Sequence, residues 1–216
     1  MRTVTTTAFI THCWKSARLD FAVLLCCASL IGVLPQIAQA ESAPTQVSSL
    51  QFERNADSLL LTATVNFSLP ATVEDALLKG VPVIFVAEAD IFRERWYWLD
   101  KRVVSTQRHM RLVYQPLTQR WRLAVASGLI TNNGLGVALN QTFDTLEEAL
   151  GVIRRVSGWQ IAELAELEPG ARYRVDFFFR LDVTQLPRPL QIGVLGQSDW
   201  SLSTSATRRL DLENLK

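Results

Sequence analysis

The stretch Tyr173-Arg-Val-Asp-Phe-Phe-Phe-Arg-Leu-Asp-Val183 decides the fold, because its apolar side chains alternate strictly with other residues. Successive side chains of a β-strand point to opposite faces of a sheet, so residues two apart share a face. One face of this stretch is therefore apolar, whereas the other is mostly charged. Such alternation predicts a strand with one buried and one wet face. The apolar face consists of Tyr173, Val175, Phe177, Phe179, Leu181 and Val183.

The same two-residue period recurs over residues 59–69, where every odd position is apolar. Residues 81–91 are largely apolar at both odd and even positions, which is typical of a central strand buried on both faces. Gly-rich and Asn-rich residues 128–141 are expected to form a loop. Shorter strands are predicted at 47–53, 110–114, 120–125, 159–164, 190–194 and 199–204.

Two stretches have the spacing of amphipathic helices instead. We expect one helix to run from an N-cap at Thr72 to Gly80. A longer one is expected between Asp144 and Gly158, with Glu147 as the partner of its cap. Many short strands and two short helices predict a mainly β fold: an antiparallel, immunoglobulin-like β-sandwich with two short packed helices.

The first forty residues have the pattern of a secretory signal peptide. Basic residues precede an uncharged apolar run at 21–34, and Ala38 and Ala40 are the small residues that signal peptidase requires. The apolar run is shorter than the roughly 20 residues that span a bilayer. We expect cleavage after Ala40, a periplasmic location, and a single β-sandwich domain over residues 41–216. The alternative is an uncleaved leader, through which alone the chain would contact a membrane.

Loss of this leader changes the chemistry that the chain can perform. All three cysteines and one of the two histidines lie in the leader, and the net charge of the whole chain is only +1. Residues 41–216 therefore contain no thiol and a single histidine, His109, which we expect to be an ordinary exposed residue rather than a pH sensor. We predict no metal and no cofactor. The balanced charge argues against a nucleic-acid partner.

The densest cluster of aromatic and charged residues is Arg93-Glu-Arg-Trp-Tyr-Trp-Leu-Asp-Lys-Arg102. If the preceding strand continues through it, Trp96 and Trp98 share one face and offer about 400 Å² of apolar surface. The flanking arginines suit carboxylates or other anions. Alternatively, the two tryptophans pack in the core of the sandwich, as aromatic residues often do. The candidate binding patch consists of Arg93, Arg95, Trp96, Trp98, Asp100 and Arg102.

A second candidate surface follows the strand at 171–183. Its two prolines impose an extended conformation and cannot donate to a sheet ladder, so a rigid crossover is expected there. The same segment is a candidate docking loop for a partner. Its members are Leu186, Pro187, Pro189 and Gln191.

Catalysis has weaker support in the sequence. Glu88 and Asp90 would lie about 7 Å apart on one strand face, within the range that glycoside hydrolysis requires. Glu94 and Asp100 are further candidate acids. The chain contains no nucleophile elbow, P-loop or dinucleotide-binding motif. We therefore expect no enzymatic activity.

Five phrases occur along the chain in the order Ala76-Leu-Leu-Lys-Gly-Val-Pro82, Arg95-Trp-Tyr-Trp-Leu-Asp100, Tyr114-Gln-Pro-Leu-Thr118, Leu181-Asp-Val-Thr-Gln-Leu-Pro-Arg-Pro-Leu-Gln191 and Asp199-Trp-Ser-Leu202. In this order they resemble the proteobacterial periplasmic proteins catalogued as domain of unknown function family 4390. The resemblance implies a secreted bacterial protein with no established activity, and it assigns no catalytic residue. Genes of this family often lie beside a membrane sensor kinase of the nitrogen-regulation type, which implies a kinase ectodomain as one candidate partner.

Taken together, the sequence predicts a periplasmic binding or interaction module whose partner is a protein or another component of the cell envelope. The alternative is a small-ligand-binding protein, or a hydrolase using paired carboxylates, that acts in the envelope.

Overall fold

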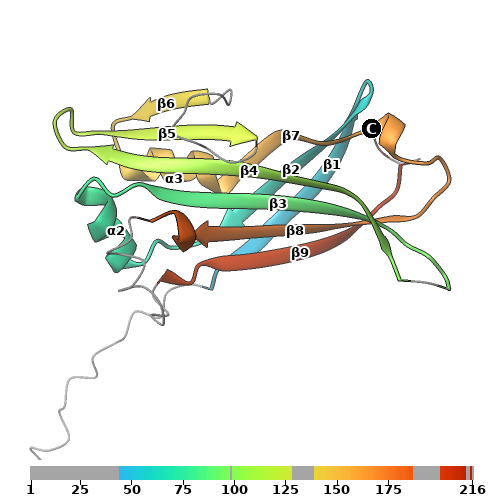
Figure 1. Ribbon diagram of the computed structural model, residues 1–216. Helices are drawn as coiled ribbons and strands as arrows, with labels where there is room; N and C mark the ends of the chain where they lie inside the picture. Colours follow the sequence, from blue (N-terminus) through green and yellow to red (C-terminus); the bar gives the residue numbers. More distant parts are fainter. Residues whose placement is uncertain (1–43, 98, 128–138, 187–199, 213–214, 216) are drawn as a thin grey trace, which may run out of the picture. The chain divides into compact units, whose positions relative to one another are not determined.

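Antiparallel strands dominate the computed structural model (Figure 1), which describes residues 44–97, 99–127, 139–186, 200–212 and 215. The two α-helices among these residues are α2 (Ala71–Leu78) and α3 (Leu146–Arg154), and two short 3₁₀ turns are η1 (Leu164–Glu166) and η2 (Val183–Gln185). The strands are β1 (Gln46–Asn55), β2 (Ser58–Asn66), β3 (Val83–Arg93), β4 (Lys101–Gln115), β5 (Arg120–Ser127), β6 (Leu139–Phe143), β7 (Arg155–Glu163), β8 (Tyr173–Asp182) and β9 (Ser203–Leu210).

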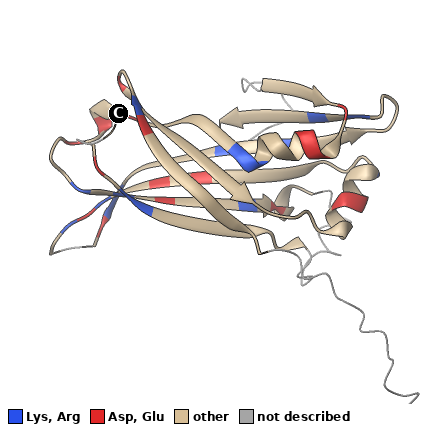
Figure 2. Ribbon diagram, turned by 180° about the vertical axis from the view of Figure 1, so that it is seen from behind, with Lys and Arg blue, Asp and Glu red and all other residues tan. Residues whose placement is uncertain are grey.

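The described strands form two sheets. The large sheet has six strands in the order β6-β5-β4-β3-β8-β9, and the small sheet has three in the order β1-β2-β7. Every pairing is antiparallel. The small sheet and α3 cover the same face of the large sheet (Figures 1 and 2). The expected mainly β class, with two antiparallel sheets and two helices, is confirmed.

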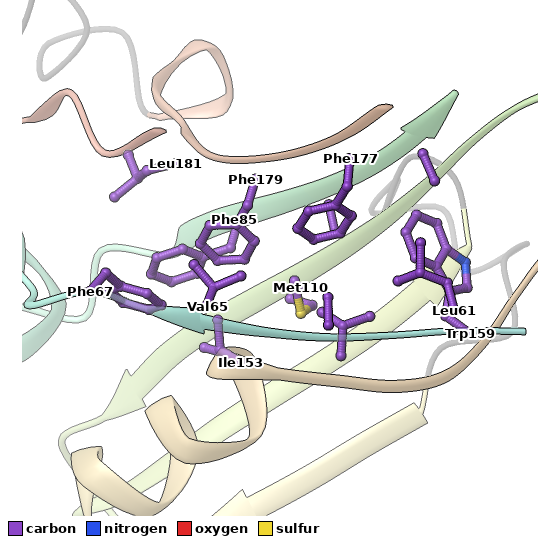
Figure 3. Packing of buried hydrophobic residues seen from close by; sticks show 14 of the residues in the cluster. Leu61, Val65, Phe67, Phe85, Met110, Ile153, Trp159, Phe177, Phe179 and Leu181 are labelled. Atoms are coloured by element: carbon purple, nitrogen blue, oxygen red, sulfur yellow. The ribbon is translucent and has the colours of Figure 1, made fainter. Parts of the chain in front are cut away.

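The core lies between this covered face and the elements upon it (Figure 3). Phe67 follows β2, whereas Phe85 and Phe179 project from neighbouring strands of the large sheet, and the three ring centroids lie 5.5 to 6.0 Å apart. Aromatic rings at these separations attract one another in addition to the area that they bury. The predicted alternation places these rings correctly, since the alternate apolar residues of β2 and β8 point into this core.

The central position predicted for residues 81–91 is also confirmed, because β3 lies between β4 and β8. Its side chains are buried on both faces: Phe85 faces the core, while Ile84 and Val86 on the outer face are also buried. Continuous apolar character in a strand indicates this situation.

The ends of several elements differ from the prediction. Helix α2 begins at Ala71, with Pro70 rather than Thr72 as its N-cap. Helix α3 is capped by Thr145, whose hydroxyl accepts a hydrogen bond from the backbone N–H of Glu148 at 3.3 Å. It ends at Arg154 because the next residues pair with β2 in the small sheet, so Val156 belongs to a strand and not to the helix.

The last strand differs most. Strand β9 occupies Ser203–Leu210, beginning near the end of the segment predicted at 199–204, and it pairs along β8. The strand predicted at 190–194 lies outside the described residues, as does most of the loop predicted at 128–141. Among the described residues, no helix is long and apolar enough to cross a membrane.

Candidate functional site

The residues of the predicted binding patch lie around one hairpin. Strands β3 and β4 separate after the pair formed by Arg93 and Lys101, and the described residues of the β3–β4 loop are 94–97, 99 and 100. The loop projects from the end of the large sheet opposite α2 (Figure 1). The strand does not continue through the described residues of this segment, so the condition for a shared strand face is not met. The described patch residues lie at and beside the tip of a hairpin.

The described apolar side chains of this loop face solvent. Trp96 is 93% exposed, Leu99 is 89% exposed and Tyr97 is 67% exposed. The rings of Trp96 and Tyr97 meet edge to face, with centroids 4.8 Å apart. The alternative of packing in the core is wrong for Trp96, whereas Trp98 lies outside the described residues.

Hydrogen bonds fix the base of the β3–β4 loop. The backbone N–H of Glu94 donates to the carbonyl oxygen of Arg172 at 2.9 Å, which ties the loop to the segment before β8. The backbone N–H of Arg95 lies 3.4 Å from Oδ1 of Asp100 and donates to it across the loop. The guanidinium of Arg174 donates to the other oxygen of Asp100 at 2.8 Å. Asp100 thus links both arms of the loop to β8.

Arg174 is the centre of this network, although the patch predicted from sequence omits it. It donates to Asp176 at 3.1 Å as well as to Asp100, and its guanidinium lies 5.1 Å from the ring centroid of Phe92. Burial opposes the charge of Arg174, but the two carboxylates outweigh this and raise its pKa above the ordinary value. Arg174 therefore remains a cation and holds both carboxylates.

Intramolecular ion pairs also occupy most of the other charged residues near the loop. Arg93 pairs with Glu168. Arg102 lies 3.6 Å from a carboxylate oxygen of Asp90. Glu94 lies 3.5 Å from the guanidinium of Arg209. Of the predicted patch, Arg93, Asp100 and Arg102 therefore serve the fold as well as any partner, and both charge signs gather at this end of the sheet (Figure 2).

Two exposed cations beside the aromatic tip have no such partner. Within the described part of the chain, no acidic side chain lies within 4 Å of the charged groups of Arg95 or Lys101. Because the nearby acids Glu94 and Asp100 pair with arginines of β9 and β8, they do not cancel these two charges. The tip consequently combines apolar side chains with a positive charge surplus.

A cavity of about 410 Å³ lies at the base of the loop. It is lined by Glu94 and by residues 170–173 and 209–212. This volume falls within the range of small-ligand sites. Its wall contains four charged residues, Glu94, Arg172, Arg209 and Asp211, and two of them, Glu94 and Arg209, already face one another.

Of the residues predicted for the docking loop, the structure describes Leu186. Leu186 is buried, and its backbone N–H donates to the carbonyl oxygen of Val183 at 3.3 Å. Its side chain is therefore not available to a partner, contrary to the prediction. Pro187, Pro189 and Gln191 lie outside the described residues.

The candidate catalytic carboxylates lie on the outer face of the large sheet. Glu88 and Asp90 do share a face of β3, as predicted, but Glu88 accepts a hydrogen bond from Arg180 at 3.0 Å and Asp90 faces Arg102. His109 lies on the same face beside Val86 and is 2% exposed, so the expectation of an exposed histidine is wrong. Among the described residues, no group of three His, Asp or Glu side chains is placed to hold a metal ion.

Sequence reasoning missed Arg174, Arg172 and Arg209 as neighbours of the loop. The alternation in β8 places Arg174 on the wet face, which was a usable signal. Its contact with Asp100 depends on β8 pairing with β3, and strand order cannot be derived from the period of a single strand.

Comparisons with known proteins give one match. Residues 42–210 match the model of a family described as "Domain of unknown function (DUF4390)". No curated protein and no solved structure matches the chain.

Proposed function

Because the chain belongs to the DUF4390 family, whose description assigns no activity, we propose its function from its geometry: it is a binding module of the bacterial cell envelope, and the β3–β4 loop is its contact surface. The observation that carries this proposal is the exposure of Trp96 and Leu99, which are 93% and 89% exposed at the end of a braced hairpin. Large apolar side chains gathered on a surface mark interaction sites, whereas scattered ones do not.

The arrangement of the loop supports binding. The hydrogen bonds of Glu94 and Asp100 hold its base, so little conformational entropy is lost at the base when a partner binds the tip. Aromatic residues with neighbouring arginines are also the residue types that contribute most to binding surfaces.

A periplasmic location forms part of this proposal. It is supported by the leader pattern over residues 1–40. A protein, such as a sensor kinase ectodomain, and a lipid surface are both envelope components that the loop could contact.

We favour binding over catalysis because of the partners of the candidate acids. Glu88 and Asp90 each face an arginine on the outer face of the sheet. Both carboxylates are therefore already engaged in ion pairs of the sheet. Small-ligand binding would use the cavity at the base of the loop, where Glu94 and Arg209 already face one another.

Site-specific photo-crosslinking in living cells tests the proposal. A photoreactive amino acid replaces Leu99 in one variant and Leu117 in a matched control, since Leu117 is 100% exposed in the turn between β4 and β5. We expect position 99 to give a discrete crosslinked species, identified by mass spectrometry as one envelope component, and position 117 to give none. The same products at both positions, or none at 99, would overturn the proposal.

A further inference from the structure

The apolar tip of the β3–β4 loop matches the interface of a lipid bilayer better than the surface of a folded protein. Tryptophan and tyrosine have an apolar ring and one polar group, and they concentrate where hydrocarbon meets headgroups. Trp96 and Tyr97 stand together at the tip, and Leu99 supplies a purely apolar side chain beside them.

The size and shape of this patch favour the same occupant. Three side chains of roughly 150–250 Å² each provide less than the roughly 800 Å² that each partner contributes to a standard protein interface. A convex tip would also need a matching pocket in a protein partner, whereas lipid headgroups rearrange around an inserted side chain. The patch is sufficient for shallow insertion into an interface.

The charges at the tip select the kind of lipid. Arg95 and Lys101 flank the apolar residues and have no acidic partner within 4 Å in the described part of the chain. The acids of the loop do not repel an anionic surface at full strength, because Glu94 and Asp100 face Arg209 and Arg174. Each basic residue near an anionic membrane contributes about a fivefold gain in affinity, and this gain decreases with added salt.

We infer that the β3–β4 loop docks the protein onto an anionic phospholipid surface, with Trp96, Tyr97 and Leu99 inserted at the level of the headgroups and Arg95 and Lys101 paired with lipid phosphates. This inference rests on the proposed function, since it names the envelope component that the loop contacts. The network around Arg174 keeps the tip oriented away from the large sheet during contact.

Co-sedimentation with lipid vesicles tests the inference, using protein purified from cells that express the full chain. One set of vesicles contains phosphatidylethanolamine and phosphatidylglycerol, and the other contains only phosphatidylcholine. The apolar variant is W96S with L99S, and its control is L117S at the opposite end of β4. The charge variant is R95Q with K101Q, and its control is R155Q with K79Q, which removes two exposed cations elsewhere.

We expect the wild type to bind the anionic vesicles and to release them as salt is added. The apolar variant should bind the vesicles at least about tenfold more weakly than the wild type. The charge variant should bind about 25-fold more weakly than the wild type, and this loss should appear with the anionic vesicles alone. Both controls should bind as the wild type does.

Three results would overturn the inference: no binding of the wild type to anionic vesicles, binding that both loop variants retain, or an equal loss in the controls. If the wild type does not bind vesicles while position 99 crosslinks a single envelope protein, the lipid inference fails and the proposed function stands. If position 99 gives no crosslink and the loop variants bind vesicles like the wild type, both fail.

Discussion

The two faces of the large sheet are held by different interactions. Toward the small sheet and α3, strand β8 presents Phe177 and Phe179, both fully buried. Toward the outside, the same strand presents Arg174, Asp176 and Arg180, each in an ion pair with an acidic or basic neighbour. Adjacent residues of β8 therefore belong to an aromatic core on one face and to a network of charges on the other.

The inner face of the sheet therefore supplies most of the stability, whereas the outer face supplies the charged groups at the surface. A buried aromatic ring contributes several kcal/mol, whereas an exposed ion pair contributes about 0–1 kcal/mol. The outer face nevertheless needs its arginines, because Asp90 lies directly opposite Asp176 on neighbouring strands. Like charges in such a pair destabilise a sheet unless cations compensate them.

The largest expected loss of stability comes from a substitution on the inner face of the large sheet. Phe179→Ala removes a ring that stacks against Phe67 and Phe85, and we expect the free energy of unfolding to fall by about 3–5 kcal/mol. Phe178→Ala is the matched control, since this neighbouring residue is 41% exposed on the outer face and should cost no more than about 1 kcal/mol. Urea unfolding followed by circular dichroism measures both. Equal losses in the two variants would contradict the assignment of the faces.

A smaller loss of stability is expected when the ion pairs of Arg174 on the outer face are removed. Arg174→Met keeps most of the side-chain volume but leaves Asp100 and Asp176 without their shared cation, so we expect a loss of about 1–2 kcal/mol in the free energy of unfolding. Arg209→Met is the control, because its side chain is 86% exposed and its guanidinium lies 3.5 Å from Glu94 at the surface. The control should change stability by less than about 0.5 kcal/mol in the same urea titration. An Arg174 variant as stable as this control would show that the ion pairs of Arg174 contribute nothing to the free energy of unfolding.

The outer face also predicts a dependence on pH at the end of β8. Burial alone would raise the pKa of Asp182, but the hydroxyl of Thr184, the amide of Gln185, the backbone N–H of Thr184 and the charge of Arg180 together lower it. A carboxyl whose pKa is lower in the folded state stabilises the fold above its unfolded pKa of about 3.9, and this contribution disappears as pH falls through the folded value.

Asp182→Asn should therefore cost about 1 kcal/mol near neutral pH, and the two proteins should converge in stability as the pH falls through the folded pKa of Asp182, which lies below its ordinary value. Urea titrations across this pH range measure the difference. Asp75→Asn on the exposed surface of α2 serves as the control. A gap between wild type and D182N that stays constant down to low pH would show that the loss comes from packing and not from the charge of Asp182.

The buried and exposed faces of the strands could be predicted from sequence, because the period of two in β2 and β8 indicates directly which side chains are buried. The central strand β3 was predictable for the same reason, since nearly continuous apolar character requires cover on both faces. These features depend on local pattern alone. The two-sheet fold follows from several such strands with few helices between them.

The site was less predictable, since it depends on where pairing stops. Residues 94–100 contain no glycine, proline or asparagine to mark a turn, and Trp96 and Trp98 have the spacing of a strand. The end of pairing is set instead by contacts from distant segments, such as the bond from Glu94 to Arg172 and the ion pair of Asp100 with Arg174. The helical spacing at Val156 likewise yields to pairing with β2.

The smallest expected effect concerns the tip itself. The W96S and L99S changes together should alter the free energy of unfolding by less than about 0.5 kcal/mol, because both side chains are hydrated in the folded and unfolded states alike. Matched urea titrations with L117S measure this, and an unchanged m-value would show that the unfolded reference is the same. A loss above about 2 kcal/mol would mean that the tip packs against the rest of the chain. If stability holds while vesicle binding falls at least about tenfold, the tip acts in binding and not in folding.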